Sequence, residues 1–333
     1  MKILSWVLNK TAETPLQLPP EYHLSMLSDN IDFFIHGFKK NYIPGGEKTL
    51  VIKKRDCEQW FNEFVDKCIS ACGRQFLPIY RMSDGEFLFM LGEQPLDIRW
   101  SFKQKMRIRL GLIKHKILLS GGLGPFTQGH YHSGEYSAKE WQMARINLPH
   151  QIRKISECGI LALHLNYVKT PFAERYFPAL GKWLQEHKII INDDNYYPFY
   201  FVYAMLTGPR RGELLKNRRI LVVNGAEGDK RQKIIDGLKR EGVAEVLWCP
   251  ISLKRSLYDS VDMTPFLGKV DLALVGAGIG KSNILVQMES LNVPCIDAGF
   301  VFEVWANPEN KFKRVFCATD DDWDRIGSSP EWL

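Results

Sequence analysis

The sequence predicts an α/β protein with a Rossmann-like parallel sheet and helices on both faces. In the last third of the chain, short apolar runs typical of strands alternate with helical stretches. The runs are Arg219–Val223, Glu245–Cys249, Val270–Val275 and Val293–Ile296, and the helical stretches are Asp229–Glu241, Ser252–Ser260 and Ser282–Leu291. This alternation predicts βαβ units. Their right-handed crossovers place helices on both faces of the sheet.

A further buried strand is predicted upstream, where the apolar run that starts at Phe76 ends in Ser83-Asp84-Gly85-Glu86. The two carboxylates then lie at the C-terminal edge of the sheet, where open α/β folds bind ligands. Oxygen donors held in this way suit Mg²⁺ or Mn²⁺, especially a cation shared with substrate phosphates. Gly85 permits a tight turn or the close approach of a phosphate. The alternative is that Asp84 only caps the next helix, with Glu86 favourable in its first turn.

The other elements follow along the chain. Pro15, Pro19, Pro20 and the turn Pro44–Gly46 predict an irregular arm over residues 1–48. Apolar residues at helical spacing predict a helix from Asp56 to Cys72. We expect a strand at Gly159–Leu165 and a helix at Phe172–His187. The main domain is expected over residues 49–310, followed by a C-terminal tail over 311–333.

Residues Phe102–Leu119 combine helical periodicity with a basic face. Such a helix could make peripheral contact with an anionic membrane or reach toward phosphates, although most basic faces are merely solvated. The glycine-rich segment Gly121–Gly134 predicts a long irregular loop that shapes a pocket. It contains His130 and His132, but the sequence nearby offers no third ligand for a metal.

Composition narrows the class of protein. The chain has 333 residues, of which 45% are hydrophobic, enough for a large core. Its 44 basic and 38 acidic residues leave a formal net charge of +6, which suits an anionic ligand but not a dedicated nucleic-acid binder. The 7 scattered cysteines are typical of buried thiols in a reducing compartment. Because neither a signal peptide nor a membrane-spanning run is visible, we expect a cytoplasmic protein.

A glycine-rich turn, Val275–Ser282, joins a predicted strand to a helix and places Lys281 at the helix start. This context suits a phosphate, because free backbone N–H groups and the helix dipole favour an anion. The turn is one residue short of a P-loop, and Lys281 stands where a dinucleotide fingerprint needs glycine. It is also similar to the first motif of methyltransferases, with Leu274 in place of the usual acid. The alternative is tight packing for the glycines and a solvated position for Lys281.

The order and spacing of these motifs over residues 76 to 305 resemble those of the GT-D glycosyltransferases. The match begins at Arg81-Met-Ser-Asp-Gly-Glu-Phe, with Ser83 in place of the family's first glycine, and a basic helix follows in both. Later strand ends correspond at Asn224-Gly225 with Arg231, at Cys249-Pro250, at the glycine turn and at Ile296-Asp297-Ala-Gly299. The chain then departs from the family, because Phe300 and Phe302, followed by Glu303, stand where a histidine and a second acid are usual.

The resemblance implies a GT-D type fold and a metal-dependent glycosyltransferase that moves a hexose from a nucleotide diphosphate sugar, above all a UDP-sugar, to a glycan or glycoprotein. It implies that Asp84 and Glu86 hold Mn²⁺ or Mg²⁺ on the diphosphate, and that Asp297 is a further candidate catalytic residue. Donor contacts are expected from Arg81, Ser83, Gly85, Asn224, Gly225, Gly276, Gly278, Gly280, Lys281 and Ser282. The alternatives are an S-adenosylmethionine-dependent methyltransferase and a non-catalytic module that binds nucleotide sugars or glycans.

Overall fold

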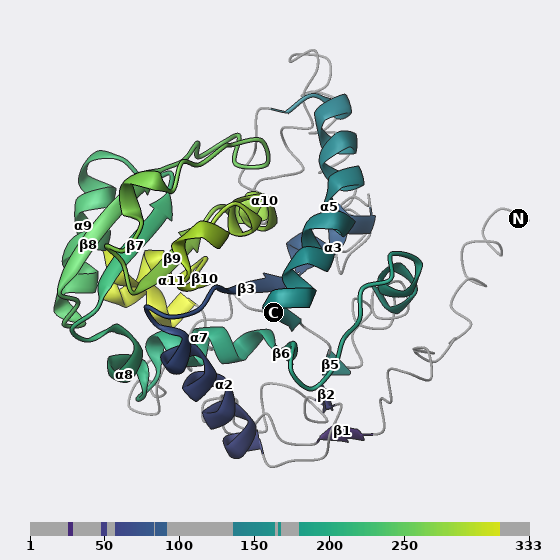
Figure 1. The fold of residues 1–333 in the computed structure, drawn as a ribbon, viewed down its shortest axis with the longest axis horizontal. Coiled ribbons are helices and arrows are strands. Elements are labelled where there is room, and N and C mark those ends of the chain that lie inside the picture. Colours follow the sequence, from purple (N-terminus) through teal and green to yellow (C-terminus); the bar gives the residue numbers. More distant parts are fainter. Residues whose placement is uncertain are drawn as a thin grey trace, which may run out of the picture.

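A parallel sheet of seven strands organises the residues that the structure describes (Figure 1). The structure is a computed structural model and describes residues 26–28, 48–51, 57–82, 84–91, 136–163, 166–167 and 180–313. In order across the sheet the strands are β6 (Tyr196–Pro198), β4 (Ile160–Leu163), β3 (Leu77–Met82), β10 (Pro294–Asp297), β9 (Leu272–Gly276), β7 (Arg219–Asn224) and β8 (Glu245–Pro250). All neighbouring pairs run parallel, so the predicted α/β class and parallel sheet are confirmed.

The central strands are apolar because they are covered on both faces. Every residue of β3, β4 and β10 is buried. Strands of this kind have continuous apolar runs instead of the alternating pattern of a half-exposed sheet. The exceptions in the central strands are Arg81 in β3 and Asp297 in β10, which are charged and nevertheless buried.

Helices cover both faces of the sheet. The α-helices are α2 (Cys57–Ala71), α3 (Asp84–Leu91), α5 (Ala138–Cys158), α7 (Phe199–Thr207), α8 (Arg211–Leu215), α9 (Gly228–Arg240), α10 (Lys281–Val286) and α11 (Val301–Ala306), and residues 180–186 are also helical. Short 3-10 turns lie at η3 (Thr264–Phe266), η4 (Gly278–Gly280), η5 (Glu289–Leu291) and η6 (Pro308–Lys313). Helix α10 packs on α5, whereas α11 packs on α9 and α7 across the sheet (Figure 1).

Strands β3 and β10 are neighbours in the sheet but come from distant parts of the chain. From β3 the chain passes through α3 and α5 to β4 on one side, whereas its other neighbour, β10, is reached from β9 through α10. After β10 the chain enters α11, which packs with α9. The two adjacent strands therefore send their following helices to opposite faces. In open α/β sheets, such a point leaves a crevice at the C-terminal ends of the strands.

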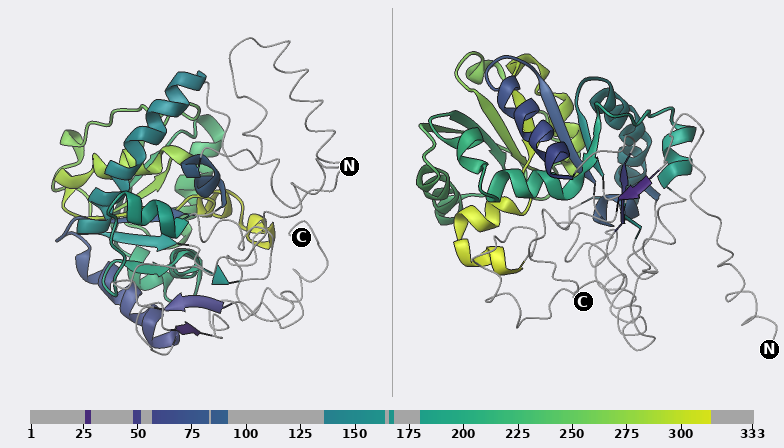
Figure 2. Two further views of the ribbon diagram at one scale, coloured as in Figure 1. Left: turned by 90° about the vertical axis from the view of Figure 1, so that its right-hand side faces the viewer. Right: turned by 90° about the horizontal axis from the view of Figure 1, so that it is seen from below.

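Aromatic side chains pack helix α2 against α7, and the two helices lie together in Figure 1 and in the right-hand view of Figure 2. Trp60 and Phe61 meet Phe201 edge to face, with ring centroids 5.1 and 5.6 Å apart. The Phe64 ring centroid lies 5.9 Å from that of Phe201, and 5.0 Å from that of Tyr197 in the preceding strand β6. Such pairs contribute beyond the area that they bury. These ring contacts hold α7 against one face of the sheet, in contact with β3 and β4.

Some predicted elements differ from those observed. Ser252–Ser260 is not helical but forms a series of turns, in which the Ser252 hydroxyl accepts from the N–H groups of Lys254 and Arg255 and the Asp259 carboxylate accepts from the Ser252 N–H. Neighbouring elements take backbone groups that a helix would use, since the Leu257 N–H donates to the Tyr136 hydroxyl and the Asn283 side chain donates to the Ser256 and Asp259 carbonyls. The helix predicted at Ser282–Leu291 ends at Val286 and resumes as the short turn η5.

Other sequence expectations concern the chain ends and segments outside the described residues. The arm expected to be irregular contains a strand, β1 (Met26–Ser28), which pairs antiparallel with β2 (Lys48–Val51), and β2 pairs with β5 (Asn166–Tyr167). The basic stretch Phe102–Leu119, the loop Gly121–Gly134 and residues 314–333 lie outside the described part. None of the helices in the described part is both long and apolar enough to cross a membrane.

We predict that Gly237→Ala destabilises the fold. A Cβ at Gly237 in α9 would lie 2.1 Å from the carbonyl oxygen of Trp305 in α11, so the two helices would have to move apart. Overpacking of this kind costs about 1–3 kcal/mol of unfolding free energy, measurable by urea denaturation. Gly212→Ala in α8 is the control, because nothing lies within 4 Å of its Cβ position. It should be neutral or stabilising by up to about 1 kcal/mol. Equal effects of the two changes would contradict this account of the α9–α11 contact.

Candidate functional site

Four charged side chains meet at the C-terminal ends of β3 and β10, the adjacent strands whose following helices lie on opposite faces of the sheet. Arg81 comes from the end of β3, Glu86 from the first turn of α3, Lys281 from the first residue of α10 and Asp297 from the end of β10. All are buried, with between 1% and 7% of each residue exposed. Charged residues are rarely buried to this degree unless they are paired. The arrangement supplies such pairs.

Asp297 is the shared centre of this cluster. Its Oδ1 lies 3.1 Å from the Arg81 guanidinium and its Oδ2 lies 2.9 Å from the Lys281 ammonium. The Arg81 Nε also donates to the Asp297 backbone carbonyl at 2.8 Å. One carboxylate thus holds two cations that come from distant parts of the sequence. Asp297 was predicted to be a catalytic residue, and that role stays a prediction; in the structure its carboxylate contacts Arg81 and Lys281.

Lys281 joins the two parts of the predicted site. Its ammonium lies 2.6 Å from Glu86 Oε1 as well as 2.9 Å from Asp297. The acidic segment and the glycine turn therefore lie at the same edge of the sheet. The alternative of a solvated lysine is wrong, since only 4% of Lys281 is exposed. Its ammonium also lies 5.3 Å from the centroid of the Tyr80 ring.

The Arg81 guanidinium contacts both the Asp297 carboxylate and the Tyr203 ring. Burial by itself would lower its pKa, but the Asp297 carboxylate and the Tyr203 side chain more than offset this, so the pKa of Arg81 is raised. Its Cζ lies 4.2 Å from the centroid of the Tyr203 ring. Gly299, with φ +48°, also lies next to Arg81, because an added Cβ there would lie 1.8 Å from the Arg81 Nη2. Gly299 is therefore needed both for its backbone conformation and for the space that Arg81 occupies.

Close packing explains most glycines that were expected to contact phosphates. A Cβ on Gly276 would meet the Asn224 side chain at 2.2 Å and the Phe302 ring at 2.6 Å. On Gly225 it would meet the Leu253 backbone at 2.8 Å, and on Gly280 the Ser256 backbone at 2.4 Å. At these three positions the protein itself fills the space next to the glycine.

The other residues that were predicted to contact the sugar donor either have partners within the protein or lie outside the described part. Asn224 donates to the Gly276 carbonyl at 3.2 Å and accepts from the Ala226 N–H at 2.7 Å, so it joins β7 to β9. The Ser282 hydroxyl donates to Gln151 of α5 at 2.8 Å. Gly278 has a positive φ of 53°, which glycine tolerates best, and Gly85 is buried in α3. Ser83 and the side chain of Asp84 lie outside the described residues.

The carboxylates at this edge of the sheet fit a divalent cation if Asp84 also contributes a ligand. Glu86 and Asp297 already flank a cation, because the Lys281 ammonium lies between them. Carboxylate oxygens are also the ligands that Mg²⁺ and Mn²⁺ prefer. In the described part, no group of three or more His, Cys, Asp or Glu side chains is arranged to hold a metal ion. A metal at this edge would therefore need Asp84 beside Glu86, and it would compete with Lys281 for Glu86.

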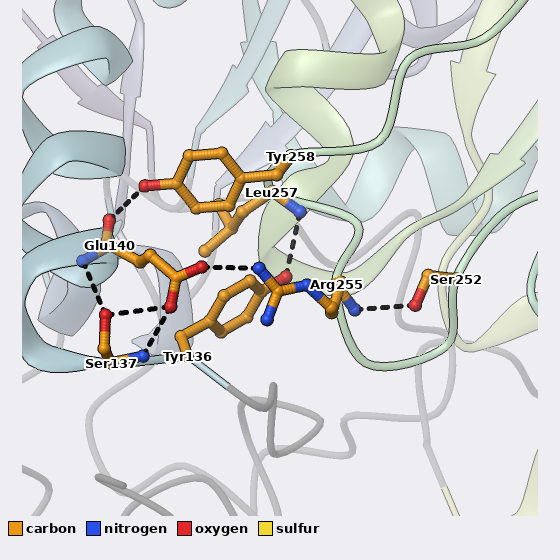
Figure 3. A network of polar contacts seen from close by, with 7 residues as sticks. All are labelled: Tyr136, Ser137, Glu140, Ser252, Arg255, Leu257 and Tyr258. Carbon is orange, nitrogen blue, oxygen red and sulfur yellow. Dashed lines mark hydrogen bonds and ion pairs between the residues drawn. The ribbon is translucent and has the colours of Figure 1, made fainter. Parts of the chain in front are cut away.

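A loop that follows β8, residues 251–260, packs against the start of α5 (Figure 3). We call it the β8 loop. Its Ser256 hydroxyl donates to the Ala277 carbonyl at 2.7 Å, which holds the loop against the turn before α10. Toward α5, Arg255 pairs with Glu140, and the Leu257 N–H donates to the Tyr136 hydroxyl at 3.0 Å.

Sequence reasoning missed two contributors to this site. Helix α7 supplies Tyr203, but its run Phe199–Thr207 is apolar throughout and has no helical pattern. Helix α5 supplies Glu140, and here a signal existed. Ser137 and Glu140 form a capping box, in which the Ser137 hydroxyl accepts from the Glu140 N–H and the Glu140 carboxylate accepts from the Ser137 N–H. A Ser-x-x-Glu pattern of this kind marks helix starts.

Comparisons of the chain with models of protein families, with curated proteins and with solved structures find no match.

We predict that Asp297→Asn lowers the free energy of unfolding by about 3–5 kcal/mol, because breaking a buried ion pair leaves uncompensated charge. Chemical denaturation would measure the loss. Asp66→Asn is the matched control, since the Asp66 carboxylate also pairs with an arginine, Arg210, at 2.7 Å but is 66% exposed. It should cost less than about 1 kcal/mol. Similar losses in the two variants would contradict a central role for Asp297.

A second prediction concerns the pH dependence of the β8 loop contact. The pKa of Glu140 is lowered to about 2, first by the backbone N–H of Ser137 and then by the Arg255 side chain. Because the ordinary value is 4.5, the stability from this contact is complete above about pH 4.5 and is lost as the pH falls toward about 2. NMR titration should show that Arg255→Met raises the pKa of Glu140 only partway. Glu213, whose pKa is lowered by Arg210, should not respond.

Proposed function

We propose that the protein is a GT-D type glycosyltransferase that transfers a hexose from a nucleotide diphosphate sugar, a UDP-sugar above all, to a glycan or glycoprotein. The observation that carries the proposal is the contact of Glu86 with Lys281, 2.6 Å apart at the C-terminal edge of a parallel sheet. This contact unites the acidic segment with the glycine turn. Both features contributed to the resemblance, and nothing in their separation along the chain required them to meet.

The chemistry of the reaction matches the charges at this edge. Cleaving the bond between the sugar and the phosphate leaves a nucleoside diphosphate, whose developing charge must be stabilised by cationic groups already in place. Lys281 is the cation at this edge that contacts Glu86. Arg81 pairs with Asp297 and fixes the orientation of that carboxylate. A Mn²⁺ or Mg²⁺ ion held by Asp84 and Glu86 would supply Lewis-acid stabilisation of the same charge.

The methyltransferase alternative has less support. It needs the glycine turn to lie against the cofactor, but the space beside Gly276 is filled by Phe302 and Asn224, and that beside Gly280 by Ser256. The second alternative, a module that binds nucleotide sugars without transferring them, has the same binding chemistry. It differs only in turnover, which a kinetic assay detects.

We expect UDP-sugars with Mn²⁺ to raise the melting temperature of the protein, and S-adenosylmethionine to leave it unchanged. A ligand at 100 times its Kd adds about 2.7 kcal/mol to the unfolding free energy, or several degrees for a chain of this size. Glu86→Gln should abolish the Mn²⁺-dependent part of the shift. Glu289→Gln is the control, because Glu289 also pairs with a lysine, Lys154, at 2.7 Å but is 63% exposed.

Turnover separates an enzyme from a binding module. Release of UDP from the donor, with or without an added glycan, should fall by about 10²–10³-fold in Glu86→Gln, by analogy with the loss of one electrostatic group elsewhere. Donor binding without any UDP release would favour the binding module. A melting temperature that responds to S-adenosylmethionine and to no nucleotide sugar would overturn the proposal.

A further inference from the structure

We propose that Arg145 in α5 binds an oxyanion of a substrate, a phosphate or a carboxylate group, next to the cluster at the ends of β3 and β10. For the identity of the substrate the inference rests on the proposed function. It adds a binding residue that neither the motifs nor the family resemblance pointed to. The observations behind it are the place of Arg145 in the fold, the lack of a polar partner for its side chain, and its apolar surroundings.

Arg145 lies between two helices that meet at the ligand-binding edge of the sheet. It is near the start of α5, the end of the helix that the β8 loop contacts through Glu140. Helices α3 and α5 are in contact (Figure 1), and the Arg145 Cζ lies 6.0 Å from the centroid of the Phe89 ring in α3. Phe89 follows Glu86 by three residues, so the two are neighbours on one face of α3. Arg145 and Lys281 thus approach adjacent positions of the same helix.

The guanidinium of Arg145 has no polar partner within the described part of the chain. Its Nε is shielded from solvent and has no hydrogen-bond acceptor. The positions three and four residues away in α5 are Trp141, Gln142, Leu148 and Pro149, none of which offers a carboxylate. Buried polar groups are nearly always hydrogen-bonded, so one without a partner requires an explanation. A guanidinium presents a planar fork of donors that matches an oxyanion, and a bound oxyanion would supply the missing acceptor.

The surroundings of Arg145 leave its charge available to a ligand. Phe89 packs edge to face on Trp141, and Trp141 packs in the same way on Tyr136, with centroids 5.2 Å apart in both pairs. All three rings are buried. An aromatic ring attracts a cation without neutralising it. A hydrogen bond formed beside such rings is stronger than one in water, because the local dielectric constant is low.

Arg145 should therefore contribute to ligand binding and not to the stability of the ligand-free protein. Arg145→Met keeps an apolar stem but deletes the charge and the donors. Without a ligand we expect an unchanged or raised melting temperature, because a buried donor without a partner disappears. We expect the affinity for an anionic ligand to fall by about tenfold or more, because charge-assisted hydrogen bonds are lost. A purely structural arginine would give the opposite pair of results.

The experiment measures two kinds of probe by calorimetry on the full chain. UDP with Mn²⁺ tests an oxyanion of the sugar donor. Glucose 6-phosphate and glucuronate, added with and without UDP and Mn²⁺, test an oxyanion of an acidic acceptor. The probe whose affinity falls in Arg145→Met identifies the source of the oxyanion. Arg74→Met is the matched control, since Arg74 is exposed, has no ion pair in the described part and precedes β3, at the opposite edge of the sheet. It should change no affinity.

The outcomes separate this inference from the proposed function. Unchanged affinity of Arg145→Met for every probe would overturn the oxyanion site, even if the native protein binds UDP as proposed. Binding of a sugar acid that depends on Arg145, without any binding of UDP, would overturn the proposed function and leave the site in place. A native protein that binds none of the probes would overturn both.

Arg145→Lys provides a second measurement if the methionine variant does not fold. Lysine keeps the positive charge but lacks the planar fork of donors. We expect this variant to bind the same probe more weakly than the native protein. Equal affinity of Arg145→Lys and the native protein for every probe would overturn recognition of an oxyanion by the guanidinium.

Discussion

The carboxylate of Asp297 is the constraint on which the arrangement of this protein depends. It lies at the end of β10 and binds Arg81 from β3 and Lys281 from α10, both buried. A buried charge is tolerated only with a partner of good geometry. Each element that contributes to the cluster must therefore reach its position together with the others. The same interaction that holds the centre of the sheet also collects charge at the edge where ligands bind in such folds.

The glycines near this edge bring the backbone segments into contact. Gly225 and Gly280 allow the β8 loop to lie directly against the ends of β7 and η4, and Gly276 makes room for Phe302. Phe302 is one of the positions at which the sequence departs from the family that it resembles. In the structure it packs against the turn that the family resemblance identified, so the departure and the turn belong to one packing arrangement.

Sequence reasoning succeeded where physical chemistry is local. Strands β7 to β10 are short apolar runs between helical repeats, and their bounds differ from those expected by one or two residues. The edge position of the acids followed from where an apolar run stops. Sequence reasoning failed where contacts between distant residues determine the local structure or the burial of a side chain. The Ser252–Ser260 segment was expected to be helical, but the Tyr136 hydroxyl and the Asn283 side chain bind backbone groups inside it instead. The burial of Lys281 depends on Glu86 and Asp297, which no local pattern connects to it.

Pairing the first strand of the sheet with the last has a consequence for biosynthesis. Arg81 and Asp297 are 216 positions apart, and a ribosome adds about 5–20 residues per second. Roughly 10–40 s therefore pass between the synthesis of β3 and that of its neighbour β10. During that time one edge of the future central strand has no native partner, and unpaired edges invite association with other chains. Parallel pairing over such a separation is also slow, so the nascent chain is most vulnerable to misassembly along β3.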